Sequence, residues 1–289
     1  MSTWSRRDFL NSSAGVIAAM ASMGPSAFAI ESGTRRKGHI RQSVAQWCFP
    51  KLTIDALSAV AAKIGLQGVD LLEVQDYDIP RRYGLRCTMA YLGHGYEDPM
   101  EIESGYNRLE NHDRLEELCR ENIPKAANSG ITNAIVFSGN RDELPDDTGI
   151  KNAIVGLNRV KNIAEDHGVT LCLELLSHKN YMFDHTAWGV RVMEGVNSPN
   201  VKILYDIFHA QIMDGNLINT ITKNIQWIGH FHTGGVPGRG NLDNTQEINW
   251  VGVMQAIVRS GYKGYVAHEF LPKGDPIAAL RAAVDLCDV

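Results

Sequence analysis

From residue 40 onward, short runs rich in β-branched and aromatic residues alternate with longer stretches in which apolar residues recur every three or four positions. The first pattern is typical of buried strands, and the second is typical of helices with one apolar face. Several helical stretches end in a glycine just before the next apolar run, which suits a left-handed helix cap. The pattern predicts eight strands, at approximately residues 40–46, 68–74, 85–92, 132–138, 169–176, 201–208, 227–233 and 264–270.

This regular alternation indicates the fold class. Eight strand and helix units within about 250 residues fit a closed barrel better than an open doubly wound sheet, so we predict a single (β/α)8 TIM barrel of the α/β class. The connection after the second strand is short and contains Pro80, which predicts a stunted helix. The connection after the third strand is long, and its His94 and Tyr96 are candidates to cover the barrel mouth.

The first 29 residues differ from the rest of the chain. Arg6 and Arg7 precede Phe9, a weakly apolar stretch follows, and small residues stand at 27–29. This resembles a twin-arginine export signal, whose pathway carries folded proteins, so we expect a signal peptide at 1–29, a barrel at 30–289 and a periplasmic product. The apolar stretch is shorter than the roughly 20 residues needed to span a bilayer. We therefore expect no stable membrane insertion after cleavage, with retention as an anchor as the alternative.

Composition and charge narrow the classes of partner. The chain is 44% hydrophobic and 21% charged, as ordinary globular domains are. Removal of residues 1–29 would leave 28 − 2 = 26 basic and 33 − 1 = 32 acidic residues, a net charge of −6. Such a chain is a poor partner for nucleic acid, and no glycine-rich nucleotide-binding motif follows any strand. The five cysteines are odd in number and lack a C-x-x-C pair, which indicates core residues rather than a disulfide framework.

Polar residues end four consecutive predicted strands: Glu174, Asp206, His232 and Glu269. In a (β/α)8 barrel the carboxyl ends of the strands surround the active site, so these side chains should converge. Three carboxylates packed together would repel one another, and a bound divalent metal would compensate their negative charge. One histidine with three carboxylates suits manganese, magnesium or cobalt, with zinc also allowed. The structural alternative is that each acid caps a helix and the histidine is a core residue.

Other residues near the predicted strand ends have weaker signals. His230 should face the same interior as His232 one layer deeper, either supporting the site or packing in the core. His268 points away from Glu269 along its strand and is expected to be structural. Trp47 and Phe49 follow the first strand, where they would form an apolar wall for a sugar or ordinary packing. Glu73 ends the second strand, and we assign it no role.

From Arg41 to the C-terminus the sequence resembles the xylose-isomerase-like barrels, and most closely their hydroxypyruvate isomerase branch. The motifs that carry the resemblance lie in the second half of the chain, at 201–209, 228–232, 236–239, 247–250, 261–265 and 269. The resemblance implies that Glu174, Asp206, His232 and Glu269 hold the metal, and that Glu174 and Glu269 also move the proton. It further implies that two residues bind substrate oxygens, namely His209 and Arg239.

The resemblance leaves the substrate open. Hydroxypyruvate isomerases tend to have glutamine where His232 stands, whereas the ketose 3-epimerases of the same superfamily have histidine there. The well-known family members also work in the cytoplasm, and this chain carries an export signal. A small sugar or keto acid remains the expected partner. Barrels of this kind often form dimers or tetramers, so a homo-oligomer is allowed as well.

The predicted cluster of metal-binding residues would allow proton transfer next to a carbonyl group. When a metal chelates both oxygens of an α-hydroxy carbonyl, it stabilises the enediolate that forms on deprotonation. Glu174 and Glu269 on opposite sides of the carbon would then act as base and acid, which gives an isomerase or epimerase of a small keto-sugar or hydroxy-keto acid. Arg239 would hold a substrate oxygen by a forked contact, or else be solvated on the glycine-rich loop 234–240. His209 would reach a substrate hydroxyl, or else cap a helix.

Three other functions are weighed against this one. A lyase would use the same metal and base to perform β-elimination on an oxidised sugar or glycoside. Phosphodiester cleavage would need additional metal-binding histidines and a basic groove, and the sequence shows neither. A non-catalytic, exported sugar-binding barrel would retain the metal as a structural element and would show no turnover.

Overall fold

The chain folds into eight parallel strands that close into a barrel in chain order, with the last strand paired to the first. The computed structural model describes residues 36–93, 102–177 and 180–289, so the predicted signal peptide and His94 and Tyr96 lie outside the described residues. The predicted single (β/α)8 barrel is confirmed. The strands are β1 (Arg41–Ala45), β2 (Gly68–Leu72), β3 (Arg86–Tyr91), β4 (Asn133–Val136), β5 (Thr170–Glu174), β6 (Val201–Asp206), β7 (Ile228–Thr233) and β8 (Tyr265–His268).

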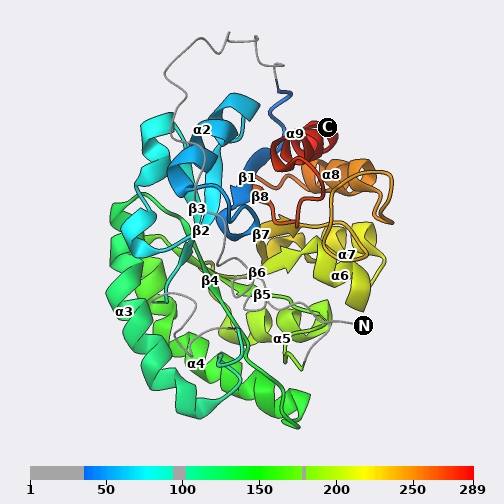
Figure 1. Ribbon diagram of the computed structural model, residues 1–289. Helices are drawn as coiled ribbons and strands as arrows, with labels where there is room; N and C mark the ends of the chain where they lie inside the picture. Colours follow the sequence, from blue (N-terminus) through cyan, green and yellow to red (C-terminus); the bar gives the residue numbers. More distant parts are fainter. Residues whose placement is uncertain (1–35, 94–101, 178–179) are drawn as a thin grey trace, which may run out of the picture. The chain divides into compact units, whose positions relative to one another are not determined.

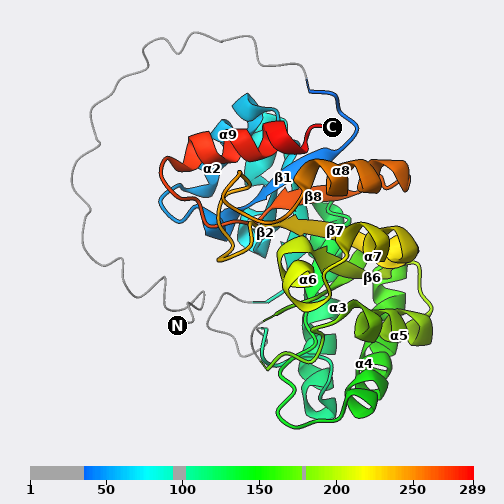
Figure 2. The ribbon, with the colours of Figure 1, turned by 90° about the vertical axis from the view of Figure 1, so that its right-hand side faces the viewer.

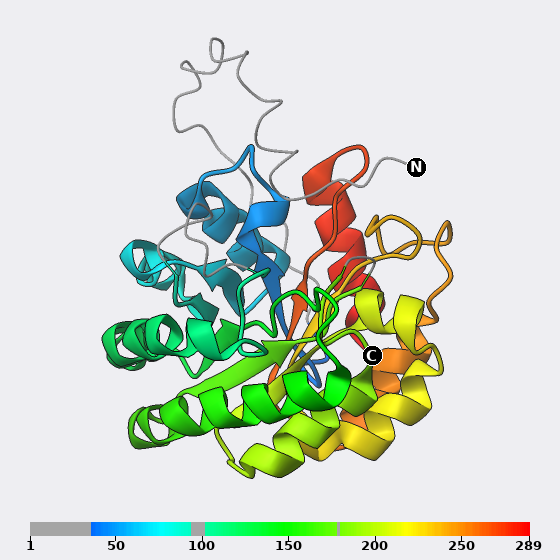
Figure 3. The same cartoon turned by 90° about the horizontal axis from the view of Figure 1, so that it is seen from below.

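The helices surround the strands as a ring, which is clearest in the view from below (Figure 3). Their apolar faces pack against the outside of the barrel, while the strands are buried on both sides. The α-helices are α2 (Ile54–Ile64), α3 (His112–Asn128), α4 (Asp146–His167), α5 (Thr186–Val196), α6 (Ile207–Met213), α7 (Leu217–Asn224), α8 (Trp250–Arg259) and α9 (Pro276–Cys287).

Helix α2 illustrates how the sequence fixes these elements. The Oγ1 of Thr53 accepts a hydrogen bond from the N–H of Ala56 at 3.1 Å and caps the first turn. Gly65 ends the helix with a φ of 91°, a left-handed conformation that glycine adopts without steric cost. Between these caps, Leu57 and Ile64 lie on the buried face. Burial of each such side chain contributes about 1.5–3 kcal/mol.

The connection after β2 forms no α-helix. Two short 3₁₀ helices, η2 (Val74–Asp76) and η3 (Ile79–Tyr83), take its place, as Pro80 predicted. The pairing of β2 with β3 is also irregular. Thr88 and Leu71 are extra residues, one in each strand, on either side of the pair formed by Asp70 and Met89. Leu71 has a φ of 59°, which costs a leucine on the order of 1–3 kcal/mol.

The two ends of the described barrel meet. Strand β8 pairs with β1, and α9 packs beside α2 (Figures 1 and 2). The backbone N–H of Lys37 donates to both carboxylate oxygens of Asp288 at 3.0 Å, and His39 Nδ1 lies 2.9 Å from the carbonyl oxygen of Val289. These contacts tie the segment before β1 to the residues that follow α9.

Two further expectations concern the described residues. The five cysteines are all buried, and no disulfide joins them, in agreement with their predicted role in the core. Among residues 36–93, 102–177 and 180–289, no helix combines the length and apolar character that crossing a membrane requires.

Candidate active site

The four polar residues predicted from the strand ends come together at the barrel mouth. Glu174 ends β5, Asp206 ends β6, His232 lies near the end of β7, and Glu269 directly follows β8. None of the four side chains has exposed surface. One potential ligand atom from each lies within 4.8 Å of all the others, because the carboxyl ends of neighbouring parallel strands share one edge of the barrel.

Both geometry and charge suit a divalent cation. Donor atoms that share one ion at about 2.1 Å lie at most about 4.2 Å apart, so the cluster is within roughly half an ångström of a coordination shell. Three carboxylates contribute −3, and the buried guanidinium of Arg239, which contacts two of them, contributes +1. With a neutral His232 the balance is −3 + 1 = −2. A divalent ion would balance the charge of these five residues.

His232 is held from both sides of its ring. Its Nδ1 lies 2.6 Å from Glu269 Oε2 and 3.3 Å from Glu174 Oε1, but makes no hydrogen bond of acceptable geometry. Its Nε2 lies 2.9 Å from Asp70 Oδ2. Burial alone would lower the pKa of His232, but the charge of Glu269 and the contacts with the carboxylates outweigh burial and raise that pKa well above its usual value. The cluster therefore favours positive charge.

Asp206 performs two tasks with its two oxygens. Oδ1 accepts hydrogen bonds from the N–H groups of Phe208 at 2.8 Å and His209 at 3.3 Å, which caps α6. Oδ2 accepts from Nη2 of Arg239 at 2.6 Å and faces the cluster. Asp206 therefore caps α6 through Oδ1, as the structural alternative predicted. Its Oδ2 stays available to the proposed metal site.

Arg239 lies inside the site, and the alternative of a solvated arginine on a flexible loop is wrong. Gly235 and Gly240 exchange backbone hydrogen bonds of 2.9 and 3.1 Å that close the loop, and only 8% of Arg239 is exposed. Its guanidinium contacts Asp206 and Glu269 and lies 5.0 Å from the ring centroid of Phe208. A Cβ at position 234 would stand 2.9 Å from Arg239 Cγ, so Gly234 leaves room for this side chain.

His209 lies at the rim of the cluster. Its Nδ1 accepts from the backbone N–H of Ser177 at 3.1 Å and lies 2.7 Å from the Ser177 hydroxyl. Its Nε2 lies 3.1 Å from Nη1 of Arg239 and 3.7 Å from Asp206 Oδ2. Since Asp206 caps α6, His209 is not the cap. The two residues predicted to bind substrate oxygens are therefore in contact beside the cluster.

The aromatic residues after β1 separate into two roles. Trp47 donates its indole N–H to Glu269 Oε1 at 2.5 Å, so it orients a carboxylate of the cluster. The sequence predicted only an apolar wall or packing for Trp47 and did not reveal this hydrogen bond. Phe49 is buried and packs edge-to-face on Phe270 with ring centroids 6.2 Å apart, which is ordinary packing.

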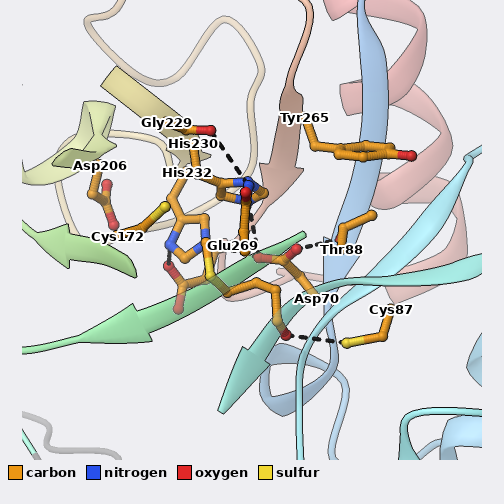
Figure 4. A network of polar contacts seen from close by, with 12 residues as sticks. Asp70, Cys87, Thr88, Cys172, Asp206, Gly229, His230, His232, Tyr265 and Glu269 are labelled. Carbon is orange, nitrogen blue, oxygen red and sulfur yellow. Dashed lines mark hydrogen bonds and ion pairs between the residues drawn. The ribbon is translucent and has the colours of Figure 1, made fainter. Parts of the chain in front are cut away.

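Sequence reasoning missed Asp70. This residue lies in the middle of β2, and its carboxylate joins His230 and His232 in a buried network that also includes Thr88 (Figure 4). His230 therefore supports the site one layer deeper, as one of its two interpretations predicted. The signal for Asp70 was a single charged residue inside a five-residue apolar strand, away from the strand ends.

Two further side chains have local partners outside the cluster. His268 is buried, with Nε2 2.8 Å from Gln42 Oε1 and Nδ1 3.2 Å from Thr233 Oγ1, as expected of a structural residue. Burial, with the charge of Arg36, lowers the pKa of His268 to about 3. Glu73 accepts a hydrogen bond from Gln75 at 2.7 Å and is not part of the cluster.

Comparison with known proteins places this architecture in a family. The family model described as a xylose isomerase-like TIM barrel matches residues 59–288. The chain belongs to the xylose isomerase-like TIM barrel family. Among solved structures, the family 2 AP endonuclease of Brucella melitensis covers 83% of this chain and 97% of its own with a TM-score of 0.73. At 23% identity this likeness shows the fold alone.

Curated relatives of this xylose isomerase-like barrel match shorter stretches. The hydroxypyruvate isomerase of Escherichia coli is 32% identical over 131 residues, which are 44% of this chain and 50% of that protein. The D-psicose 3-epimerase of Ruminiclostridium cellulolyticum is 33% identical over 124 residues, which are 41% of this chain and 40% of that protein. The alignments thus span half or less of these two relatives.

Proposed function

We propose that this protein is a divalent-metal-dependent isomerase or epimerase of a small keto-sugar or hydroxy-keto acid, which works by proton transfer through an enediolate. The observation that carries the proposal is the buried cluster of Glu174, Asp206, His232 and Glu269, whose ligand atoms lie within 4.8 Å of one another. The names of the two curated relatives, an isomerase and an epimerase, support the same class of reaction. Manganese is the preferred ion, and magnesium, cobalt and zinc are the alternatives.

The side chains of the cluster divide the chemistry among them. A divalent ion held by the four residues would supply Lewis acidity, which acidifies the C–H bond beside a carbonyl. Glu174 and Glu269 carry the proton, as the resemblance to the xylose-isomerase-like barrels implies, and they come from opposite ends of the β5 to β8 series. Return of the proton to the neighbouring carbon gives an aldose–ketose shift. Return to the opposite face of the same carbon gives an epimer.

Arg239 and His209 orient the substrate. Both present nitrogen atoms beside the cluster, with Nη1 of Arg239 3.1 Å from Nε2 of His209. A guanidinium binds a carboxylate or two hydroxyl oxygens by parallel N–H donors. This pair therefore supports substrates with oxygens on carbons next to the reacting one, such as short sugars and keto acids.

The test is solvent deuterium incorporation, followed by NMR, into a panel of ketoses, aldoses, 3-keto sugars and hydroxypyruvate. Mature protein loaded with manganese is compared with its Glu269→Gln variant. Glu73→Gln is the matched control, because Glu73 is a carboxylate near a strand end that lies outside the cluster. We expect metal-dependent exchange with isomer or epimer formation in the wild type and in Glu73→Gln, and its loss in Glu269→Gln.

The other functions predict different outcomes. Exchange accompanied by loss of a substituent would make the protein a lyase that performs β-elimination on an oxidised sugar or glycoside. Binding of a sugar without exchange or turnover, in the presence of manganese, would indicate a non-catalytic sugar-binding barrel. Either result would contradict the proposed isomerase or epimerase.

We further propose that the protein is exported to the periplasm by the twin-arginine pathway, on the basis of Arg6, Arg7 and the small residues at 27–29. Replacement of both arginines by lysine should retain the protein in the cytoplasm as the uncleaved precursor. Cell fractionation and N-terminal sequencing of the mature protein check this. Export of the doubly substituted chain would contradict the proposal.

A further inference from the structure

The carboxylate of Asp70 is the centre of a buried polar network that crosses the barrel interior. Its Oδ2 lies 2.9 Å from Nε2 of His232 and 3.1 Å from Nε2 of His230. Its Oδ1 accepts a hydrogen bond from the hydroxyl of Thr88. Asp70, His230 and His232 have no exposed surface, and Figure 4 shows the three side chains together. The network thus joins β2, β3 and β7 behind the proposed metal cluster.

The chemistry of these groups fixes where the protons lie. An ionised carboxylate only accepts hydrogen bonds, so both Nε2 atoms that contact Asp70 must carry a hydrogen. The amide nitrogen of Asn133 lies 3.4 Å from Nδ1 of His230, which suits an unprotonated Nδ1 and a proton at Nε2. For His232, a proton at Nε2 leaves Nδ1 as the atom that can bind a metal. That atom faces Glu174 and Glu269.

The backbone around Asp70 supports a special role for this residue. Extra residues in β2 and β3 flank the pair formed by Asp70 and Met89, and one of them, Leu71, has the left-handed φ of 59°. The other extra residue, Thr88, is the one that donates to Asp70. Irregularities of this kind commonly re-aim side chains beside functional sites. Three donors on its two oxygens then keep the Asp70 carboxylate from rotating.

We propose that Asp70 is a positioning residue that selects the ligand nitrogen of His232, since acceptance of the Nε2 proton directs the lone pair of Nδ1 toward the carboxylate cluster. This inference rests on the proposed metal site. Residues that orient a metal-binding histidine in this way typically change metal affinity by 10- to 100-fold when they are replaced. Asparagine at position 70 is neutral, so even where its carbonyl oxygen accepts the Nε2 proton it holds the ring less strongly than the carboxylate does.

The first experiment measures Mn²⁺ binding to metal-free protein by calorimetry. The wild type is compared with Asp70→Asn and with the control Glu73→Gln, which removes a carboxylate from the same segment of the chain. We expect one ion per chain, an affinity that is 10- to 100-fold lower in Asp70→Asn, and an unchanged affinity in Glu73→Gln. Equal affinities of wild type and Asp70→Asn would overturn the role of Asp70 and leave the proposed function intact.

Two other binding results also decide the question. Failure of the wild type to bind Mn²⁺ or Zn²⁺ would refute the proposed function together with this inference. Two ions in the wild type and one in Asp70→Asn would show that Asp70, His230 and His232 hold a second ion. Asp70 would then be a ligand rather than a positioning residue, and the inference would be wrong.

A second experiment needs no variant of Asp70 and therefore decides the case even where Asp70→Asn does not fold. Long-range ¹H–¹⁵N NMR of wild-type protein loaded with Zn²⁺, a diamagnetic probe, reports which ring nitrogen carries the proton. The His232 signal is identified as the one that is missing from the spectrum of the His232→Gln variant. We expect a proton on Nε2 and the metal on Nδ1. Metal on Nε2, or a proton on Nδ1, would overturn the inference.

Discussion

The two halves of the barrel contribute different kinds of residues to the site. Strands β5 to β8 supply all four members of the proposed metal cluster, each at or next to the end of its strand. Strands β1 to β4 and their loops supply side chains that touch the cluster, or that touch Asp70 or His230 behind it. These supporting residues are Trp47, Asp70, Thr88 and Asn133.

This division separates binding from orientation. The residues of β5 to β8 can bind an ion and move a proton, whereas those of β1 to β4 fix rotamers and tautomers through hydrogen bonds. Substitutions in the first group should remove activity, and substitutions in the second should reduce it while the fold and the ligands persist. The following variants test that separation, from the largest expected effect to the smallest.

Glu174→Gln should cause the largest loss. The substitution removes a proposed base and one carboxylate of the cluster, so the rate of solvent deuterium exchange should fall by about 10²- to 10⁴-fold. Metal affinity should fall in the same variant. Exchange measured by NMR at saturating manganese checks the first effect, and calorimetry checks the second. Exchange at more than a tenth of the wild-type rate would remove Glu174 from the catalytic group.

Arg239→Lys should have the next largest effect. Lysine keeps the positive charge beside Asp206 and Glu269 but loses the planar fork of donors. We expect KM for the substrate to rise about 10- to 100-fold, with a smaller change in kcat, in steady-state kinetics of the manganese enzyme. An unchanged KM would mean that Arg239 serves only to balance the carboxylates.

Trp47→Phe tests the supporting half directly. Phenylalanine keeps an aromatic ring but removes the N–H that donates to Glu269 Oε1. A hydrogen bond to a charged group contributes about 1.5–3 kcal/mol, so kcat should fall roughly tenfold or somewhat more. Metal affinity, measured by calorimetry, should change by less than about threefold because Oε2 is untouched. A kcat equal to that of the wild type would show that Glu269 needs no support from β1.

His268→Gln should change only the dependence of stability on pH. The unfolded chain binds a proton at this histidine below about pH 6.5, whereas the folded chain does so only near pH 3, so folding loses stability as the pH falls through this window. The slope for one group is at most about 1.4 kcal/mol per pH unit. Urea unfolding at pH 7, 6 and 5 should show a shallower slope in the variant. Parallel slopes would indicate a protonated His268 in the native state.

The strand positions were predicted well from the sequence. Every predicted run contains the observed strand. The larger errors lie at the carboxyl ends. Residues 207 and 208 were predicted as strand but begin α6, because Asp206 Oδ1 accepts the N–H groups of the first turn. A local apolar pattern does not reveal such a cap when the capping residue also belongs to the site.

The four side chains that the sequence grouped at the strand ends do converge, because the fold implies this geometry. Strand ends of a parallel barrel meet at one edge, so Glu174 and Glu269 could be grouped without any knowledge of contacts. Asp70 lies mid-strand, and its partner His232 is 162 residues away in the chain. Trp47 and Glu269 are separated by 222 residues. No local pattern in a single sequence marks such pairs, since each residue alone looks like part of the core.

Closure of the barrel also governs when the site can exist during synthesis. Strand β8 pairs with β1 and is followed at once by Glu269, so one short segment near the end of the chain both seals the sheet and adds the last member of the cluster. A nascent chain that stops before Tyr265 exposes the edges of β1 and β7, which invite aggregation. Premature termination or trimming at this end should therefore give a protein that is both insoluble and unable to bind metal.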